Sequence, residues 1–256
     1  MKTSLRITAA LGIALILTSC SSPSPTPVTG EPATSTQGTP AEEVAKAVEP
    51  LPFNASGLLG GNTTPSFGDG DPGEVSVVQI GARLVDQKVL LFAFRNNTDE
   101  AIAHVDWTAT ARSGGSIVGS GRSQGTAPSV VQSGEVALSY IYFDNLEAIP
   151  DDAEYEFSAS SLPANTSSYN TAALKVTEAN LVGDSIVGGA VNETGADATG
   201  PFSVSIYCFD GGQMADHKMG FADQQDAADG ATVSFSENLY STSCPNFVVG
   251  VSGYFK

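Results

Sequence analysis

Short apolar runs with a period of two residues limit this chain to one fold class. The period recurs in "VDWTATARS", "EVALSYIYF", "FSVSIYCFD" and "FVVGVSGYF", and a period of two sends alternate side chains to opposite faces of a strand. No stretch of similar length has a helical period, and clusters of Gly, Asn, Asp and Ser separate the runs. The sequence therefore predicts an all-β fold of the sandwich or barrel class. The side chains expected on buried faces are Val105, Trp107, Ala109 and Ala111; Val136, Leu138, Tyr140 and Tyr142; Phe202, Val204, Ile206 and Cys208; and Phe247, Val249 and Val251.

The apolar runs occur twice along the chain. "LVDQKVLLFAFRNNT" resembles "LVGDSIVGGAVNET", and "WTATARSGG" corresponds to "VSIYCFDGG", in both cases at an offset of 97 residues. The first pair ends in Asn-rich turns and the second in a Gly-Gly hairpin signal. We therefore expect two β-sandwich domains, residues 75–163 and 172–256, joined by "SLPANTSSYNTAA".

The N-terminus has the order of a secretory signal peptide, residues 1–19. Lys2 and Arg6 lead into "ITAALGIALIL", which is shorter than the ~20 apolar residues of a transmembrane helix, and small residues then precede Cys20. "LTSC" resembles the lipobox of bacterial lipoproteins, which implies cleavage before Cys20 and a diacylglycerol on its thiol. Each buried methylene of such a chain adds ~0.8 kcal/mol of membrane affinity. The alternative is an ordinary secreted protein that is cut nearby.

Residues 20–74 are expected to form a lipidated cysteine followed by a tether. "SSPSPTPVTGEPATSTQGTPAEEVAKAVE" has too few large apolar side chains for a core and is rich in Pro, Thr and Ser. "LPFNASGLLGGNTTPSFGDGDPGE" follows without a clear period. We expect it to continue the tether or to wrap loosely against the first domain.

The chain is strongly acidic, with 28 Asp and Glu against 11 Lys and Arg and a net charge of −17. Such a surface repels nucleic acid and anionic lipid headgroups, so neither is an expected partner. Membrane contact is expected through the lipid anchor alone, which predicts an extracytoplasmic protein at the cell membrane. Solubility is the simplest reason for the charge.

Cys208 and Cys244 remain after Cys20 is assigned to lipid. In an exported chain a disulfide is the default expectation for such a pair. Closing a loop of 36 residues is worth ~4 kcal/mol in the chain-entropy treatment. Two cysteines without neighbouring histidines cannot complete a four-ligand zinc site.

The second repeat supports a family resemblance. "IYCFDGG", "DGATVSFS" and the closing "NFVVGVSGYF" resemble the FxLYD family, small immunoglobulin-like domains of bacterial surface proteins and lipoproteins. The family motif maps to Ile206, Cys208, Phe209 and Asp210, with Ile in place of Phe and Cys in place of Leu, whereas "ATARS" in the first repeat lacks the motif. The resemblance implies immunoglobulin-like architecture and a surface interaction role rather than chemistry. In structural terms Asp210 is expected to form a turn before Gly211 and Gly212, and Cys208 is expected to be a core position cross-linked to Cys244.

Catalytic patterns are scarce in this sequence. "GRSQG" fits a nucleophile elbow around Ser123, but that motif needs a strand before the serine and a helix after it. His104 and His217 lie in different repeats and are expected to be far apart. "DGDPGE" offers Asp69, Asp71 and Glu74 to a calcium ion but lacks the EF-hand series of ligands. We therefore expect no catalytic residue, no metal and no cofactor.

Two classes of function remain. The first is a non-catalytic surface lipoprotein that displays two immunoglobulin-like domains to an envelope protein, through loops or an edge strand. Its candidate surfaces are the turns at Asn96, Asn97 and Asn192 and the loop from Gly211 to Met219. The alternative is a cell-wall or carbohydrate-binding accessory factor, or with less support a hydrolase with a site at the domain junction. That class needs exposed aromatic side chains or paired carboxylates.

Overall fold

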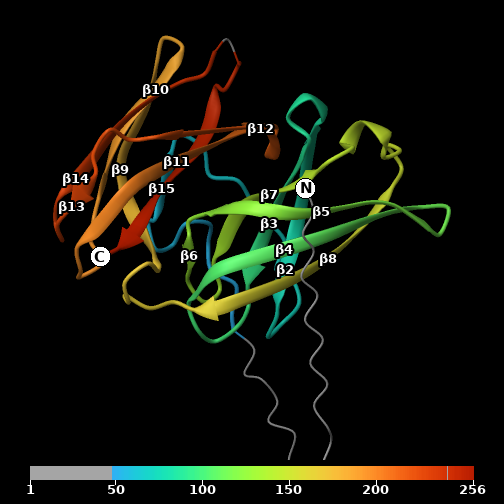
Figure 1. Ribbon diagram of the computed structural model, residues 1–256, viewed down its shortest axis with the longest axis horizontal. Coiled ribbons are helices and arrows are strands. Elements are labelled where there is room, and N and C mark those ends of the chain that lie inside the picture. The colour runs from blue at the N-terminus through green and yellow to red at the C-terminus, as the bar shows by residue number, and fades with distance from the viewer. Residues whose placement is uncertain (1–47, 241) are drawn as a thin grey trace, which may run out of the picture. The chain divides into compact units, whose positions relative to one another are not determined.

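The structure is a computed structural model that describes residues 48–240 and 242–256 (Figure 1). The signal peptide, Cys20 and the tether up to residue 47 lie outside the described residues. Almost every described element is an antiparallel β-strand, accompanied by two single-turn 3-10 helices, η1 (Val85–Gln87) and η2 (Leu146–Ala148). The predicted all-β fold is confirmed.

The first repeat forms one antiparallel sheet. Its strand order is β2-β3-β7-β5-β4-β8, with the short β6 also paired to β4. The Gly114-Gly115 hairpin has positive φ values of 56° and 79°, and these glycines allow the tight turn between β4 and β5. The strands are β2 (Val75–Leu84), β3 (Val89–Asn96), β4 (Ile102–Ser113), β5 (Ser116–Ala127), β6 (Val130–Val131), β7 (Val136–Phe143) and β8 (Glu154–Pro163).

The second repeat forms the other sheet, in the order β12-β11-β15-β9-β10-β14, with β13 on β11. Strand β9 changes partner along its length, since its first residues pair with β15 and its later ones with β10. The strands are β9 (Thr171–Val182), β10 (Ser185–Val191), β11 (Ala198–Asp210), β12 (Gln213–Phe221), β13 (Asp226–Ala227), β14 (Thr232–Asn238) and β15 (Asn246–Phe255).

The two repeats correspond strand by strand, β2 with β9 through β8 with β15, which confirms the internal repeat. If the two ends of each sheet are imagined joined, equivalent long strands follow one another in the same circular order in both repeats. The two sheets differ in which pair of neighbouring strands in that circle is left without hydrogen bonds. In the first repeat β5 pairs with β7, and the sheet is open between β8 and β2, which do not pair with each other. In the second repeat β15 pairs with β9, and the sheet is open between β12 and β14, which do not pair with each other.

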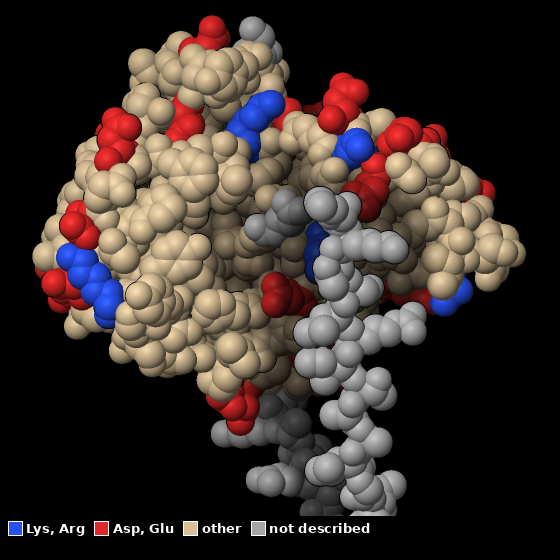
Figure 2. Space-filling view, in the orientation of Figure 1, with Lys and Arg blue, Asp and Glu red and all other residues tan. Residues whose placement is uncertain are grey.

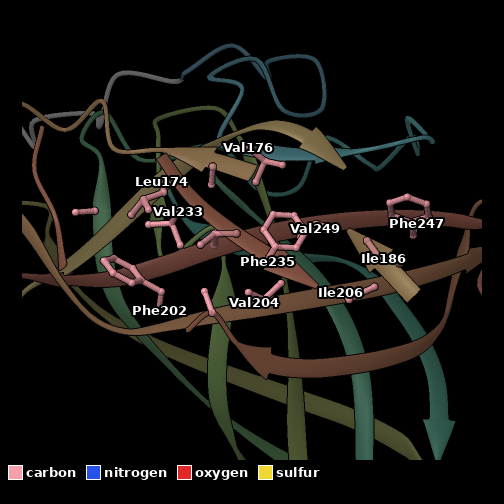
Figure 3. Packing of buried hydrophobic residues seen from close by; sticks show 14 of the residues in the cluster. Leu174, Val176, Ile186, Phe202, Val204, Ile206, Val233, Phe235, Phe247 and Val249 are labelled. Carbon is pink, nitrogen blue, oxygen red and sulfur yellow. The ribbon is translucent and has the colours of Figure 1, made fainter. Parts of the chain in front are cut away.

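Each repeat has its own apolar core. Figure 3 shows the core of the second repeat, where side chains from β9, β10, β11, β14 and β15 meet around Phe202 and Phe235. In the first repeat Trp107 packs between Phe92, Phe94 and Phe157, with ring centroids 5.2 to 6.2 Å apart. The alternating faces predicted for β4, β11 and β15 are buried as expected.

A third core lies between the repeats. Strands β3 and β7 are buried on nearly every residue because one face meets the first core and the other meets the second repeat. Strands β11 and β15 send Tyr207, Phe209 and Val248 into this shared core. The shared core makes the described chain one compact unit. The first-repeat residues that line the shared core are Val89, Leu91, Ala93, Ala127, Val136, Leu138 and Tyr140.

The segment 51–74, which we call the strap, differs from the predicted tether or loose wrap. Its residues Leu59–Gly61 form strand β1, which pairs antiparallel with β15 of the second repeat. The strap begins and ends on the first repeat, where the buried Arg95 donates to the carbonyls of Leu51 (2.9 Å) and Gly68 (3.1 Å). It therefore crosses to the second repeat and returns.

Candidate functional site

The two cysteines of the second repeat form a disulfide. Cys208 lies on β11 and Cys244 just before β15, and both side chains are buried in the core of the second repeat. The expected pairing is therefore present. A buried cross-link of this kind fits an oxidising compartment.

The motif residues drawn from the FxLYD resemblance divide between two cores. Ile206 and Cys208 face the core of the second repeat, whereas Phe209 faces the shared core. Asp210 is exposed and precedes Gly211 and Gly212, whose φ values of 55° and 87° form the hairpin turn. Burial leaves three of these four side chains no access to a ligand, so their role in this fold is structural.

The asparagine turns are buried and do not form the surface that the sequence predicts. Asn192 is fully buried, and its Nδ2 donates to the carbonyls of Ala196 (2.8 Å) and Ala227 (2.9 Å). Asn97 is also buried and donates to the carbonyls of Asp69 (2.8 Å) and Asp71 (3.0 Å). These side chains satisfy backbone carbonyls, and little of them is left for a partner.

The elbow-like Ser123 lies inside β5 rather than between a strand and a helix. Its hydroxyl oxygen accepts the backbone N–H of Trp107 at 2.8 Å. His104 is exposed, and its Nε2 lies 2.9 Å from Oδ1 of Asn170. Neither histidine is a hydrogen-bond partner of Ser123 among the described residues, so neither is placed to act as a base for its hydroxyl.

His217 is buried in the interface between the repeats, although the sequence places it in a polar loop. Its ring lies between those of Tyr140 and Tyr207, at centroid distances of 4.7 and 4.6 Å. Burial lowers the pKa of His217 from 6.5 to about 4, partly opposed by Asp216, with Lys218 lowering it further. The imidazole is therefore neutral at pH 7 and acts as a packing group.

The acidic "DGDPGE" stretch forms the end of the strap. The backbone carbonyls of Asp69 and Asp71 accept from Asn97, and the backbone N–H of Asp71 donates to Oγ of Ser76 at 2.9 Å. Within residues 48–240 and 242–256, no three Asp, Glu, His or Cys side chains are grouped to hold a metal ion.

A groove of about 380 Å³ lies at the junction of the repeats. It is lined by residues of the strap, the linker and both repeats, among them Ser56, Asn165 and Phe255. Lys175 and Glu193 form an ion pair of 3.0 Å on its wall. Glu193 is the one carboxylate among the lining residues that the structure describes, so the groove lacks the carboxylate pair of a glycoside hydrolase.

The charge of the protein does not gather into one patch on the visible face. Figure 2 shows red acidic residues spread over that face, with few blue basic ones between them and mostly uncharged surface. Exposed apolar side chains include Ile117, Leu162 and Tyr240. The visible face therefore has no concentrated acidic or basic patch that would indicate a binding site for a charged ligand.

Comparison with models of known protein families gives no match, and comparison with curated protein sequences gives none either. The resemblances to lipoproteins and to the FxLYD family therefore stay predictions. Among the described residues, no helix has the length and apolar character needed to cross a membrane.

No pattern in the sequence indicates the side chains that hold the strap in place. Arg95 and Glu135 are both buried, and Glu135 accepts from the backbone N–H and the hydroxyl of Ser56. One signal was available for the shared core: "VLLFAF" and "IYCF" are apolar at consecutive positions, which indicates strands buried on both faces.

Proposed function

We propose that this protein is a non-catalytic lipoprotein of the bacterial cell envelope. Cys20 carries the lipid, and two immunoglobulin-like repeats bind another envelope protein. The buried disulfide between Cys208 and Cys244 supports export. The acidic surface supports a water-exposed position away from anionic headgroups.

The strap is the observation that carries this proposal. Chain coming from the tether enters the folded part at Leu51, where its backbone N–H donates to the carbonyl of Gly134 (2.9 Å). Strand β1 then pairs with β15 before the strap returns to the first repeat. An anchor attached in this way presents both repeats in one fixed arrangement, as a display module requires.

Carbohydrate binding is the weaker alternative. It needs aromatic side chains exposed beside a groove, but Trp107 is 3% exposed and packs among phenylalanines in the first core. Tyr140 faces the shared core instead. Phe255, which lines the groove at the junction, is 5% exposed and offers little surface for stacking on a sugar ring.

Proximity crosslinking on intact cells tests the proposal. The wild-type chain and a Cys20→Ala variant are captured from membrane and medium, and the crosslinked molecules are identified. We expect the wild type in the membrane with a reproducible envelope protein and the variant in the medium without it. A variant that stays in the membrane contradicts the lipid anchor, and recovery of wall glycan alone favours the carbohydrate-binding alternative.

A further inference from the structure

Strand β8 has one edge paired with β4 and one edge that no strand pairs with among the described residues, which we call the open edge. We propose that the open edge binds β8 of a second copy of this chain, antiparallel, so that two first repeats form one continuous sheet. Such self-association requires neither the lipid anchor nor an envelope partner.

The internal repeat shows which kind of neighbouring strand can pair at the position of β8. The counterpart of β8 in the second repeat is β15, and β11, the counterpart of β4, covers one of its edges. Its other edge is covered by two antiparallel segments, β1 beside Val248–Gly250 and β9 beside Val251–Tyr254. The equivalent edge in the first repeat is the open edge, so an antiparallel strand fits there by the same geometry.

The backbone groups that face the open edge can be assigned. Trp107 directs its N–H toward β5, where Oγ of Ser123 accepts it at 2.8 Å, so Trp107 does not use that group to bond β8. Ala159 is opposite Trp107 and therefore directs its own N–H and C=O away from β4. By alternation the same holds for Phe157 and Tyr155, and the open edge presents a regular series of donors and acceptors.

A two-fold axis through Phe157 gives a register in which the side chains are compatible. Phe157 then lies opposite its copy, and Tyr155 lies opposite Ala159 of the other copy, so the apolar residues meet. Glu156 lies opposite Ser158, and Glu154 opposite Ser160. No carboxylate directly opposes another, which avoids the penalty for like charges across a strand pair.

Nearby charges also favour this register. Nε of Arg112 on β4 lies 2.9 Å from Oε1 of Glu156. This ion pair offsets part of the negative charge of β8 close to the proposed two-fold axis. Phe157 and Tyr155 are only partly buried in the single chain, so pairing covers more of their rings. A two-fold interface of this kind closes after two copies.

Sedimentation equilibrium of residues 21–256, which include the whole compact unit, tests the inference directly. We expect a monomer–dimer equilibrium that shifts toward dimer as salt is raised, because residues 21–256 lack Lys2 and Arg6 and each copy therefore carries 28 acidic against 9 basic residues, a net charge of −19. A monomer at every concentration and salt level overturns the proposal. In that case the open edge is left for another protein.

The variant Ala159→Pro removes an outward N–H and leaves the bonds between β8 and β4 intact. We expect it to weaken the dimer about tenfold or more, since two-fold symmetry removes the bond twice. Ala159→Val keeps the N–H and is the matched control, expected to dimerise as the wild type does. Unchanged fluorescence of Trp107, the one tryptophan, checks that the first repeat is folded.

Hydrogen exchange gives an independent readout. The amides of Tyr155 and Phe157 are expected to gain protection as protein concentration rises, and the amide of Ala159 with them. If these amides exchange at the same rate in monomer and dimer, the copies associate through another surface and the inference is wrong. A dimer that Ala159→Pro leaves unchanged contradicts it as well.

Discussion

Asn96 and Asn192 occupy the same position in the two repeats and make matching hydrogen bonds. Nδ2 of Asn96 donates to Glu100 O (2.8 Å) and Val131 O (3.0 Å), as Nδ2 of Asn192 does to two carbonyls of its own repeat. In both cases Oδ1 accepts from the N–H and hydroxyl of a threonine two residues later. The turn is thus a structural element that each repeat carries.

Asn192→Ala is expected to destabilise the protein by about 2–3 kcal/mol, because it leaves buried carbonyls and a threonine N–H without partners. Asn192→Asp should cost more, since a carboxylate oxygen then faces the carbonyls of Ala196 and Ala227. Urea unfolding measures both. Asn180→Ala, at an exposed position, is the control and is expected to change stability by less than about 0.5 kcal/mol. An Asn192→Ala variant as stable as this control contradicts the structural role.

Reduction of the disulfide between Cys208 and Cys244 is expected to lower the free energy of unfolding by about 2–4 kcal/mol. The Cys208→Ser, Cys244→Ser double variant should lose a similar amount and should no longer respond to reductant. Thermal unfolding with and without dithiothreitol measures both effects. If reductant lowers the stability of the double variant as much as that of the wild type, the loss of stability does not come from this disulfide.

Gly60→Ala is expected to release the strap. A Cβ at this position runs into the side chain of Val176, so β1 cannot keep its register against β15. We expect faster protease cleavage within residues 51–74 while the two repeats stay folded. Gly125→Ala is the control because a Cβ there meets no atom within 4 Å. Equal cleavage of the two variants would mean that β1 does not hold the strap.

His217 is expected to make stability depend on pH. Its pKa falls from 6.5 to about 4 on folding, so the unfolded chain binds the proton more tightly than the native protein does. The contribution is complete above about pH 6.5 and is lost as pH falls through 4, by on the order of 3 kcal/mol in all. His217→Phe keeps a ring between Tyr140 and Tyr207 and removes this dependence. Equal slopes of stability against pH for the two proteins between pH 6.5 and 4 would contradict the assignment.

Much of the fold could be predicted from local patterns. Alternation in "VDWTATARS" correctly assigned the buried face of β4, and the repeated turns and hairpins gave the two copies. The disulfide could be predicted because Cys208 and Cys244 are the two cysteines that remain once Cys20 is assigned to the lipid. These features depend on residues that are close together in the sequence or on a single pairing.

The arrangement of the repeats could not be predicted in the same way. Tyr207 and Phe209 alternate with the core residues of β11, and a period of two assigns them to the outer face, which a second sheet covers here. The strap has no period because its backbone is held by side chains distant in sequence, Arg95 and Glu135. The different opening of the two sheets likewise depends on contacts between distant strands.

We propose above that a lipid at Cys20 anchors the two repeats to the membrane, and mass spectrometry of the N-terminal peptide from the membrane-bound protein can detect that lipid. We expect a mature chain that begins at Cys20 and carries the added mass of a diacylglycerol on its thiol. A mature chain that begins at another residue, or an unmodified Cys20, would contradict it.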